Sequence, residues 1–262
     1  MPIYFKSLCS SSNGNCLLLW TENTRVVIDC GLSSMSRTRA LFQENFNSPK
    51  EVDAVIISHL HTDHISYYPL RVLEEYGCVV RVHRNSIEDL RRRHFNGDKL
   101  SSLRLKPFSN RQFKVGELRI KPFEIPHQPY HPTFGFVVQY EKRKIVIATD
   151  FYDWQDSLNH FIDADFIFVE SNHNLELLEL YFNPNSLFHM SNPETGRLLC
   201  SARKLSRRAP EAVMLGHISS QRNEAHLAIE ELRNRFDKEG MKIDFELFVA
   251  PLYEESEVVE IG

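Results

Sequence analysis

Residues 58–64 read Ser-His-Leu-His-Thr-Asp-His and place His59, His61, Asp63 and His64 within six consecutive positions. From the histidine and aspartate content of the chain, this pattern arises by chance on the order of once in a thousand such chains, so it is a specific signal. On a tight loop the first two histidines can face one metal ion while Asp63 and His64 turn toward a second. The competing interpretation is a set of surface histidines, or of histidines with structural partners in the core.

The flanking residues predict that this loop follows a buried strand. Residues 53–58 form a short apolar run bounded by turn residues, which favours a strand over a helix. Residues 65–76 then carry apolar side chains at helical spacing and stop at Gly77, which suits the end of a helix. Upstream we expect strands over 3–8, 15–20 and 25–29 and a helix over about 34–46.

The rest of the chain alternates between strand and helix patterns. Their order predicts two sheets flanked by helices, an α/β architecture, and we expect residues 1–262 to form one domain. Asn192, Pro193 and Glu194 open the helix of the last third, with Asn192 as its cap. Strands are expected at 79–82, 112–115, 118–123, 134–140, 144–148, 166–169, 212–215 and 242–248, and helices at 87–94, 175–181, 192–208 and 223–235.

Three later residues have side chains that can bind a metal ion, but each stands alone in the sequence. They are His127 in Glu-Ile-Pro-His-Gln, Asp150 after the strand over 144–148, and His217 directly after Gly216. A lone histidine or turn carboxylate is more often structural, so these residues gain weight only together with the first cluster. His131 lies four residues beyond His127 and is an alternative ligand.

The chain resembles the metallo-β-lactamase superfamily, because Asp29 in Val-Val-Ile-Asp-Cys-Gly, the histidine cluster and the three later residues follow one another in that family's order. The resemblance implies a four-layer αββα sandwich. It also implies one metal ion held by His59, His61 and His127, a second held by Asp63, His64 and His217, and Asp150 bridging both. Asp29 would support the ligands from behind. Imidazole ligands suit Zn²⁺, while the carboxylates suit Mn²⁺ or Fe²⁺ as well, so two divalent ions of open identity are expected.

Such a pair of ions predicts hydrolysis of an anionic substrate. With two divalent ions, two carboxylates and a bridging hydroxide, the net charge of the site is about +1. The ions would lower the pKa of the bound water toward about 7 and contact the oxygens of a phosphodiester during in-line attack. The expectation is a metal-dependent hydrolase, most simply a phosphodiesterase.

Within the superfamily the chain is similar to the bacterial YycJ/WalJ-like group, which implies a 5′ to 3′ DNA exonuclease. Matching segments span nearly the whole chain and include residues 7–16, 28–33, 121–127, 170–174, 189–192 and 215–219. Ser11, Asn13 and Asn174 depart from the pattern of that group, which leaves open the details of substrate contact. Candidate catalytic residues are Asp63 and His189.

Substrate contacts are expected in two regions. The polar turn at 10–15 can bind a phosphate through Ser12, Asn13 and Asn15, although an ordinary hairpin turn has the same composition. His189 can stabilise the attacked phosphate or protonate the leaving oxygen, and His173 is a weaker candidate of the same kind. Glu170 can orient a ligand histidine. The basic stretches at 91–94 and 203–208 are typical of solvated helix faces, and also of surfaces that follow a nucleic-acid backbone.

Composition sets the limits of these expectations. A formal charge of −4 gives no overall basic field, so a nucleic acid, DNA rather than RNA, would bind through local patches and the metals. The five cysteines form no CxxC pair, which argues against a cysteine-based zinc site. No apolar run is long enough to span a membrane and no secretory signal is visible, so a cytoplasmic protein without an obligate protein partner is expected. The alternatives are a hydrolase of a small cyclic phosphodiester, thioester or lactam, and a metal-stabilised binding module.

Overall fold

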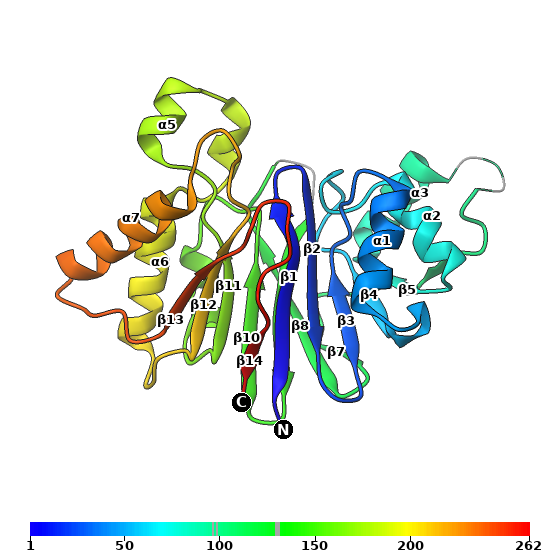
Figure 1. Cartoon of the computed structure of the whole chain (residues 1–262), viewed down its shortest axis with the longest axis horizontal. Helices are drawn as coiled ribbons and strands as arrows, with labels where there is room; N and C mark the ends of the chain where they lie inside the picture. The colour runs from blue at the N-terminus through cyan, green and yellow to red at the C-terminus, as the bar shows by residue number, and fades with distance from the viewer. Residues whose placement is uncertain (96, 98, 129–131) are drawn as a thin grey trace. The chain divides into compact units, whose positions relative to one another are not determined.

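The computed structural model describes the whole chain of 262 residues except residues 96, 98 and 129–131. The chain forms two compact units (Figure 1). Unit 1 comprises residues 1–122 together with 253–260 and 262, and unit 2 comprises residues 123–252 and 261. Each unit is built on a mixed β-sheet flanked by helices, as predicted. The expectation that the chain is one domain stays a prediction.

Unit 1 contains a sheet with the strand order β14-β1-β2-β3-β4-β5-β6. Strands β1, β2 and β3 are antiparallel, whereas β3, β4, β5 and β6 are parallel. Helices α1, α2 and α3 lie beside the parallel half (Figure 1). The strands are β1 (Ile3–Ser11), β2 (Gly14–Trp20), β3 (Arg25–Ile28), β4 (Ala54–Ile56), β5 (Val79–Arg81), β6 (Arg104–Leu105) and β14 (Val259–Ile261). The helices are α1 (Met35–Asn45), α2 (Tyr67–Glu75) and α3 (Ile87–His94), with short 3-10 helices η1 (Pro49–Glu51) and η2 (Arg84–Ser86).

The parallel strands of unit 1 are buried because helices and sheet share one core. All three residues of β4 are buried, as expected for a strand covered on both faces. Leu41 and Phe42 of α1 and Leu70 and Leu73 of α2 pack into this core. A β7–β8 pair (Phe113–Val115 and Leu118–Ile125) follows in antiparallel register, and β8 continues into unit 2.

Unit 2 is organised around strands in the order β13-β12-β11-β10-β9, with β8 next to β9. Strands β9 and β10 are antiparallel, whereas β10, β11, β12 and β13 are parallel. Helices α6 and α7 pack side by side against the sheet (Figure 1). The strands are β9 (Thr133–Tyr140), β10 (Arg143–Ala148), β11 (Phe166–Glu170), β12 (Ala212–Gly216) and β13 (Glu246–Val249). The helices are α4 (Leu158–Phe161), α5 (Leu175–Leu180), α6 (Asn192–Leu205) and α7 (Ala225–Lys238), with η3 (Gln155–Ser157) and η4 (Pro184–Phe188).

Some boundaries differ from the predicted ones for local reasons. The cap of α6 is Ser191 rather than Asn192, because the Ser191 hydroxyl accepts from the Glu194 amide and Pro193 takes the second helical position. Strand β13 begins at Glu246 rather than at 242, and Asp244, just before it, binds the Arg203 guanidinium instead of a neighbouring strand. Among the residues described, no helix is both long and apolar enough to cross a bilayer.

Candidate metal and catalytic site

The loop after β4 carries the histidine cluster of unit 1. The rings of His59 and His61 are 4.5 Å apart and those of His59 and His64 are 4.1 Å apart, measured between centroids. The Asp63 carboxylate lies 3.4 Å from Nε2 of His64. Nitrogen ligands of His59 and His61 lie within 4.8 Å of each other, a spacing that one metal ion can bridge. The structure thus brings all four residues of the motif together.

Asp29 fixes the orientation of this loop from below. Its carboxylate accepts the Ser58 amide at 2.8 Å, the Ser58 hydroxyl at 2.7 Å and Nδ1–H of His64 at 2.7 Å. Because the Ser58 hydroxyl donates to Asp29, its oxygen can accept from Nδ1 of His59, 3.1 Å away. An imidazole that donates through Nδ1 keeps its lone pair on Nε2, the form in which it binds a metal ion. The donor chemistry of this half therefore fits a divalent metal.

Two residues outside the motif set the position of the loop backbone. The Asn15 amide donates to the Asp63 carbonyl at 2.8 Å, and the Cys30 amide donates to the His64 carbonyl at 2.8 Å. Gly31, the residue after Cys30, packs directly against the loop backbone, and a Cβ added to it would lie 1.7 Å from the Asp63 carbonyl oxygen. Only glycine can occupy this position with the loop in place.

The turn predicted to bind substrate is shorter than expected. Strand β1 extends to Ser11 and β2 begins at Gly14, so the turn consists of Ser12 and Asn13, both exposed. Asn15 is buried, and its side-chain amide donates to the Ser11 carbonyl at 3.0 Å and lies 3.1 Å from Nε2 of His64. Ser12 and Asn13 can therefore meet a ligand from solvent, whereas Asn15 supports the histidine loop.

A residue that the sequence did not point to lies against this turn. The Asn13 side-chain amide donates to the hydroxyl of Tyr253 at 3.2 Å. The Arg37 guanidinium donates to the Tyr253 carbonyl at 2.7 Å, which fixes the backbone of the same residue. The Tyr253 ring is half exposed. Unit 1 thus presents an oriented aromatic ring beside the Ser12–Asn13 turn.

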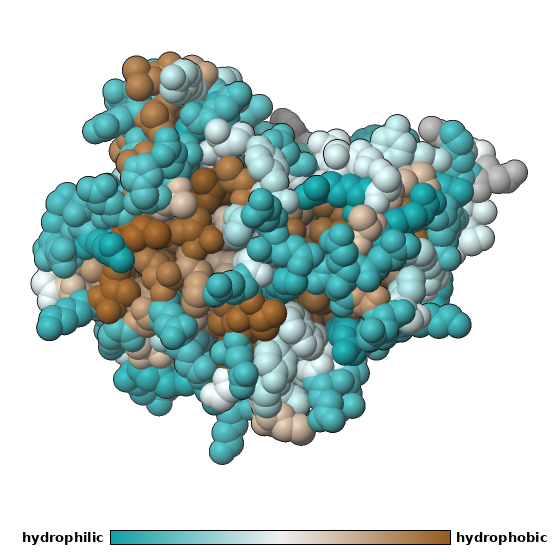
Figure 2. All heavy atoms as spheres, in the orientation of Figure 1, coloured by the Kyte–Doolittle hydropathy of each residue, from teal (hydrophilic) through white to brown (hydrophobic). Residues whose placement is uncertain are grey.

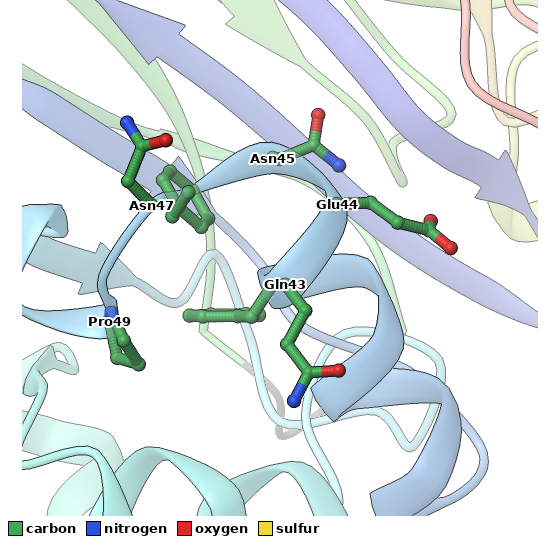
Figure 3. Close-up of a pocket in the computed structure, with 7 residues that line it drawn as sticks. Gln43, Glu44, Asn45, Asn47 and Pro49 are labelled. Atoms are coloured by element: carbon green, nitrogen blue, oxygen red, sulfur yellow. The ribbon is translucent and has the colours of Figure 1, made fainter.

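A surface pocket of unit 1 lies apart from these residues. It has a volume of about 290 Å³ and is found at the C-terminal end of α1 (Figure 3). Its lining is Phe42, Gln43, Glu44, Asn45, Phe46, Asn47 and Pro49. None of the predicted site residues lines this pocket. The candidate site is therefore identified from its cluster of histidine and aspartate side chains and not from this pocket.

Unit 2 gathers the other predicted ligands at the ends of its strands. Asp150 follows β10, His217 follows β12 and His127 follows β8. The Asp150 carboxylate oxygen Oδ1 lies 3.6 Å from Nε2 of His217 and 3.9 Å from Nε2 of His127. Ligands of one tetrahedral zinc ion are about 3.4 Å apart, so these three groups are close to metal-binding separations. Burial lowers the pKa of His127, which favours the neutral ring that a metal requires.

Glu170 joins two histidines of this cluster. Its Oε1 accepts from Nδ1 of His189 at 2.6 Å and from Nδ1 of His217 at 2.9 Å, while Oε2 accepts the Phe151 amide at 3.0 Å. Burial raises the pKa of this carboxyl, but the charges and hydrogen bonds of His189 and His217 outweigh burial and lower the pKa to about 2. Ligand atoms of Asp150, Glu170, His189 and His217 all lie within 4.8 Å of one another. Glu170 is thus an ionised carboxylate that sets the orientation of both rings.

His173 is buried close to this cluster. Its backbone carbonyl accepts the Asn192 amide at 2.9 Å, and its Nδ1 has no hydrogen-bond partner among the described residues. Burial lowers the pKa of the ring from 6.5 to about 4, and the nearby Glu170 carboxylate only partly offsets this. His173 is therefore neutral near pH 7 and can offer a substrate a hydrogen bond without adding a charge.

Replacing His173 by asparagine should make the protein less sensitive to acid. The unfolded chain binds a proton at this ring near its ordinary pKa, whereas the folded chain does so only near pH 4, so the free energy of unfolding falls as the pH drops from about 6.5 to about 4. The contribution is at most about 1.4 kcal/mol per pH unit. Urea unfolding with chelator near pH 7 and near pH 5 measures the slope. If the free energy of unfolding changed equally with pH in the wild type and in His173→Asn, the lowered pKa of His173 would be contradicted.

Three of these site residues have a left-handed backbone. Asp29, Asp150 and His217 have φ values of 61°, 62° and 50°, and each lies just after a strand. This conformation is uncommon for residues other than glycine, and such strain concentrates at functional sites. In each case the chain turns at once after the strand, which brings the side chain to the carboxyl end of the sheet.

Each predicted site residue within the described part of the chain falls into one of two groups. Unit 1 holds His59, His61, Asp63, His64, Ser12, Asn13 and Asn15, and unit 2 holds His127, Asp150, His173, His189 and His217. His131, the alternative to His127, lies outside the described residues. Sequence reasoning missed Ser58, Gly31 and Tyr253. Ser58 and Gly31 adjoin recognised motifs, whereas Tyr253 is 240 positions from its partner Asn13 and has no local signal.

Known proteins resemble this chain in sequence. A family model described as the beta-lactamase superfamily domain matches residues 24–218. Exodeoxyribonuclease WalJ of Streptococcus pneumoniae is 26% identical over 257 residues, which cover 93% of each chain. Exodeoxyribonuclease YycJ of Bacillus anthracis is 25% identical over 251 residues, covering 93% of this chain and 92% of the relative.

A solved structure shows the same fold at full length. The metallo-beta-lactamase fold protein YhfI of Bacillus subtilis superposes with a TM-score of 0.73 at 18% sequence identity. The match covers 99% of this chain and 100% of that protein. At this identity the likeness describes the fold and not the substrate.

Proposed function

The chain belongs to the beta-lactamase superfamily. We propose that it is a metal-dependent phosphodiesterase that digests DNA from a 5′ end. It is a hydrolase of the metallo-β-lactamase type with histidine and aspartate clusters suited to divalent metals. The observation that carries the finer proposal is the similarity over 93% of the chain to relatives named exodeoxyribonucleases. The proposed location of the protein is the cytoplasm.

In this proposal seven residues bind two divalent ions, Zn²⁺, Mn²⁺ or Fe²⁺. His59, His61 and His127 would hold the first ion, Asp63, His64 and His217 would hold the second, and Asp150 would supply a carboxylate to the same site. Support comes from each unit separately: Asp29 and Ser58 accept Nδ1–H in unit 1, and Glu170 and the Phe188 carbonyl accept it in unit 2. All four bonds favour binding through Nε2. Divalent ions supply Lewis acidity at neutral pH and offset the charge of a phosphodiester.

The protein's own residues then position the substrate and move a proton. His189 donates Nδ1–H to Glu170, so Nε2 is the nitrogen that can exchange a proton with the leaving oxygen. Asp63 serves as a ligand and helps to orient the attacking group. Ser12 and Asn13 contact a phosphate of the substrate, and His173 contributes a neutral hydrogen bond.

The test is a cleavage assay on defined DNA. Purified protein is incubated with Mn²⁺ or Zn²⁺ and with single-stranded and duplex DNA labelled at the 5′ or the 3′ end, and the same strands as RNA test the sugar preference. We expect early release of labelled mononucleotide from 5′-labelled DNA, loss of release with chelator, and recovery on adding metal. The activity must elute with the protein peak in gel filtration.

Two other outcomes would replace the proposal. Turnover of bis(p-nitrophenyl) phosphate or of a thioester without any metal-dependent cleavage of DNA would assign a small substrate instead. Stoichiometric metal binding without turnover of nucleic acids or small esters would support a binding module.

Substituting the exposed turn should affect substrate binding more than the chemical step. We expect Asn13→Ala to raise KM for DNA roughly three- to tenfold with kcat nearly unchanged, because one neutral hydrogen bond contributes about 1 kcal/mol. Tyr253→Phe, which removes only the hydroxyl that accepts from Asn13, should have a smaller effect of the same kind. Steady-state kinetics measure both, and a loss confined to kcat would contradict the assignment.

A further inference from the structure

Five of the seven large apolar residues that are exposed in the described part of unit 2 lie in one short segment, which we call the α5 arm (residues 175–188). It contains α5, a short connection and η4. Figure 2 shows apolar side chains at the tip of the projection that carries α5 in Figure 1. The exposed fractions are 49% for Leu175, 72% for Leu180, 59% for Tyr181, 67% for Phe182 and 60% for Leu187.

This exposure belongs to an ordered segment. The Asn174 amide donates to the Arg222 carbonyl at 2.8 Å, and the Asn174 side chain caps α5 by accepting the Leu177 amide at 3.0 Å. Leu178 and Ser186 turn inward and are buried. At the other end the Phe188 ring contacts the Tyr152 ring, with centroids 6.3 Å apart. The arm therefore presents its apolar side chains from a fixed backbone.

The arm itself carries acidic side chains and no basic ones, although the Arg222 backbone contacts its base. From residue 145 to residue 196 the sequence contains no lysine or arginine, and the arm itself carries Glu176 and Glu179. A nucleic-acid surface needs cations to offset the phosphates, and base stacking alone does not replace them. A protein surface is the occupant that this composition fits, with aromatic and aliphatic residues at its centre.

We propose that the α5 arm is the interface through which two copies of this chain associate. From the exposed fractions, the five residues offer roughly 600 Å² of accessible surface, which is at the upper end of the range for the largest apolar patch on a monomer. A standard interface buries about 800 Å² on each partner, so the arm provides most of the area that a dimer needs. In a two-fold pairing the same patch meets itself, and an apolar centre is complementary to itself. Glu176 and Glu179 are exposed on the same helix, and the dimer requires them to stay at the edge of the interface, where water solvates them.

The experiment measures the mass of the full chain in solution. Sedimentation equilibrium is run between about 1 and 100 µM for the wild type and for the double variant Leu180→Glu/Phe182→Glu. We expect a wild-type dimer and a dissociation constant raised roughly 100-fold or more in the double variant, since each buried hot spot is lost from both copies. Both substituted side chains are exposed, so circular dichroism and the melting temperature should show an intact fold.

Leu205→Glu is the matched control, because Leu205 is 56% exposed in the same unit but lies outside the arm. It should leave the dimer unchanged. A monomeric wild type at every concentration overturns the proposal, and so does equal dissociation by Leu205→Glu. If the double variant loses affinity for single-stranded DNA while its mass is unchanged, the arm is a nucleic-acid surface and the proposal is wrong.

Discussion

Gly31→Ala should reduce hydrolase activity by roughly 100-fold or more, although residue 31 is not a ligand. The added Cβ would lie 1.7 Å from the Asp63 carbonyl oxygen and 2.5 Å from the His64 amide nitrogen. Both neighbours are backbone atoms, so no side chain can move aside and the loop itself must shift. That shift breaks the bond from the Cys30 amide to the His64 carbonyl and turns Asp63 and His64 away from their ligand positions.

Metal content separates this effect from a general loss of folding. After dialysis against limiting metal, elemental analysis should find less bound metal in Gly31→Ala, together with a loss of about 1 to 3 kcal/mol in the free energy of unfolding from overpacking. Gly196→Ala is the control for a crowded glycine outside the loop. Gly196 lies in helix α6, and its added Cβ would lie 3.1 Å from the Arg235 side chain of helix α7. Wild-type metal content and activity in Gly31→Ala would show that the loop adapts and that our account of it is incorrect.

Glu170→Gln should cost roughly tenfold to 100-fold in metal affinity and a comparable factor in kcat. The carboxylate accepts three donors, from His189, His217 and the Phe151 amide. An amide has one oxygen, so in any orientation its NH₂ group faces a donor. The buried site also loses the negative charge that stabilises both imidazoles.

Glu194→Gln controls for the loss of a carboxylate in unit 2, since Glu194 accepts from the Trp154 indole and belongs to none of the groups of potential metal ligands among the described residues. Isothermal titration with Zn²⁺ and the pH profile of kcat are the measurements. Glu170→Gln should shift the acidic or basic limb of that profile if His189 moves a proton, whereas a purely structural role would lower activity equally at every pH. An unchanged zinc affinity would remove Glu170 from the positioning role.

The fold could be predicted because its signals are local and repeated. Apolar runs ending in turn residues predicted β4, β10, β11 and β12, and the structure places strands there. The resemblance to the metallo-β-lactamase superfamily, and with it the αββα fold class, is confirmed by the family match and by the full-length structural similarity. The strands β6 and β14 were not predicted, because two or three residues carry no periodicity.

The candidate site was predicted less completely than the fold. Adjacent ligands such as His59, His61, Asp63 and His64 are visible in the sequence because one loop carries them. The close approach of Gly31 to Asp63 and the bond between Asn13 and Tyr253 arise from tertiary packing of distant segments, for which spacing holds no signal. The exposure of the α5 arm was also invisible, since its leucines read as an ordinary helix face.

The left-handed conformations of Asp29, Asp150 and His217 have an evolutionary consequence. Asparagine or glycine would adopt φ near +60° at a lower conformational cost. The substitutions that remove this backbone strain therefore also remove a ligand or the residue that supports one. Asp150→Gly should therefore yield a protein with an unimpaired or higher melting temperature in chelator and no turnover. Selection for stability and selection for activity therefore favour different residues at these positions. A homologue that gains stability there by such a substitution loses its activity.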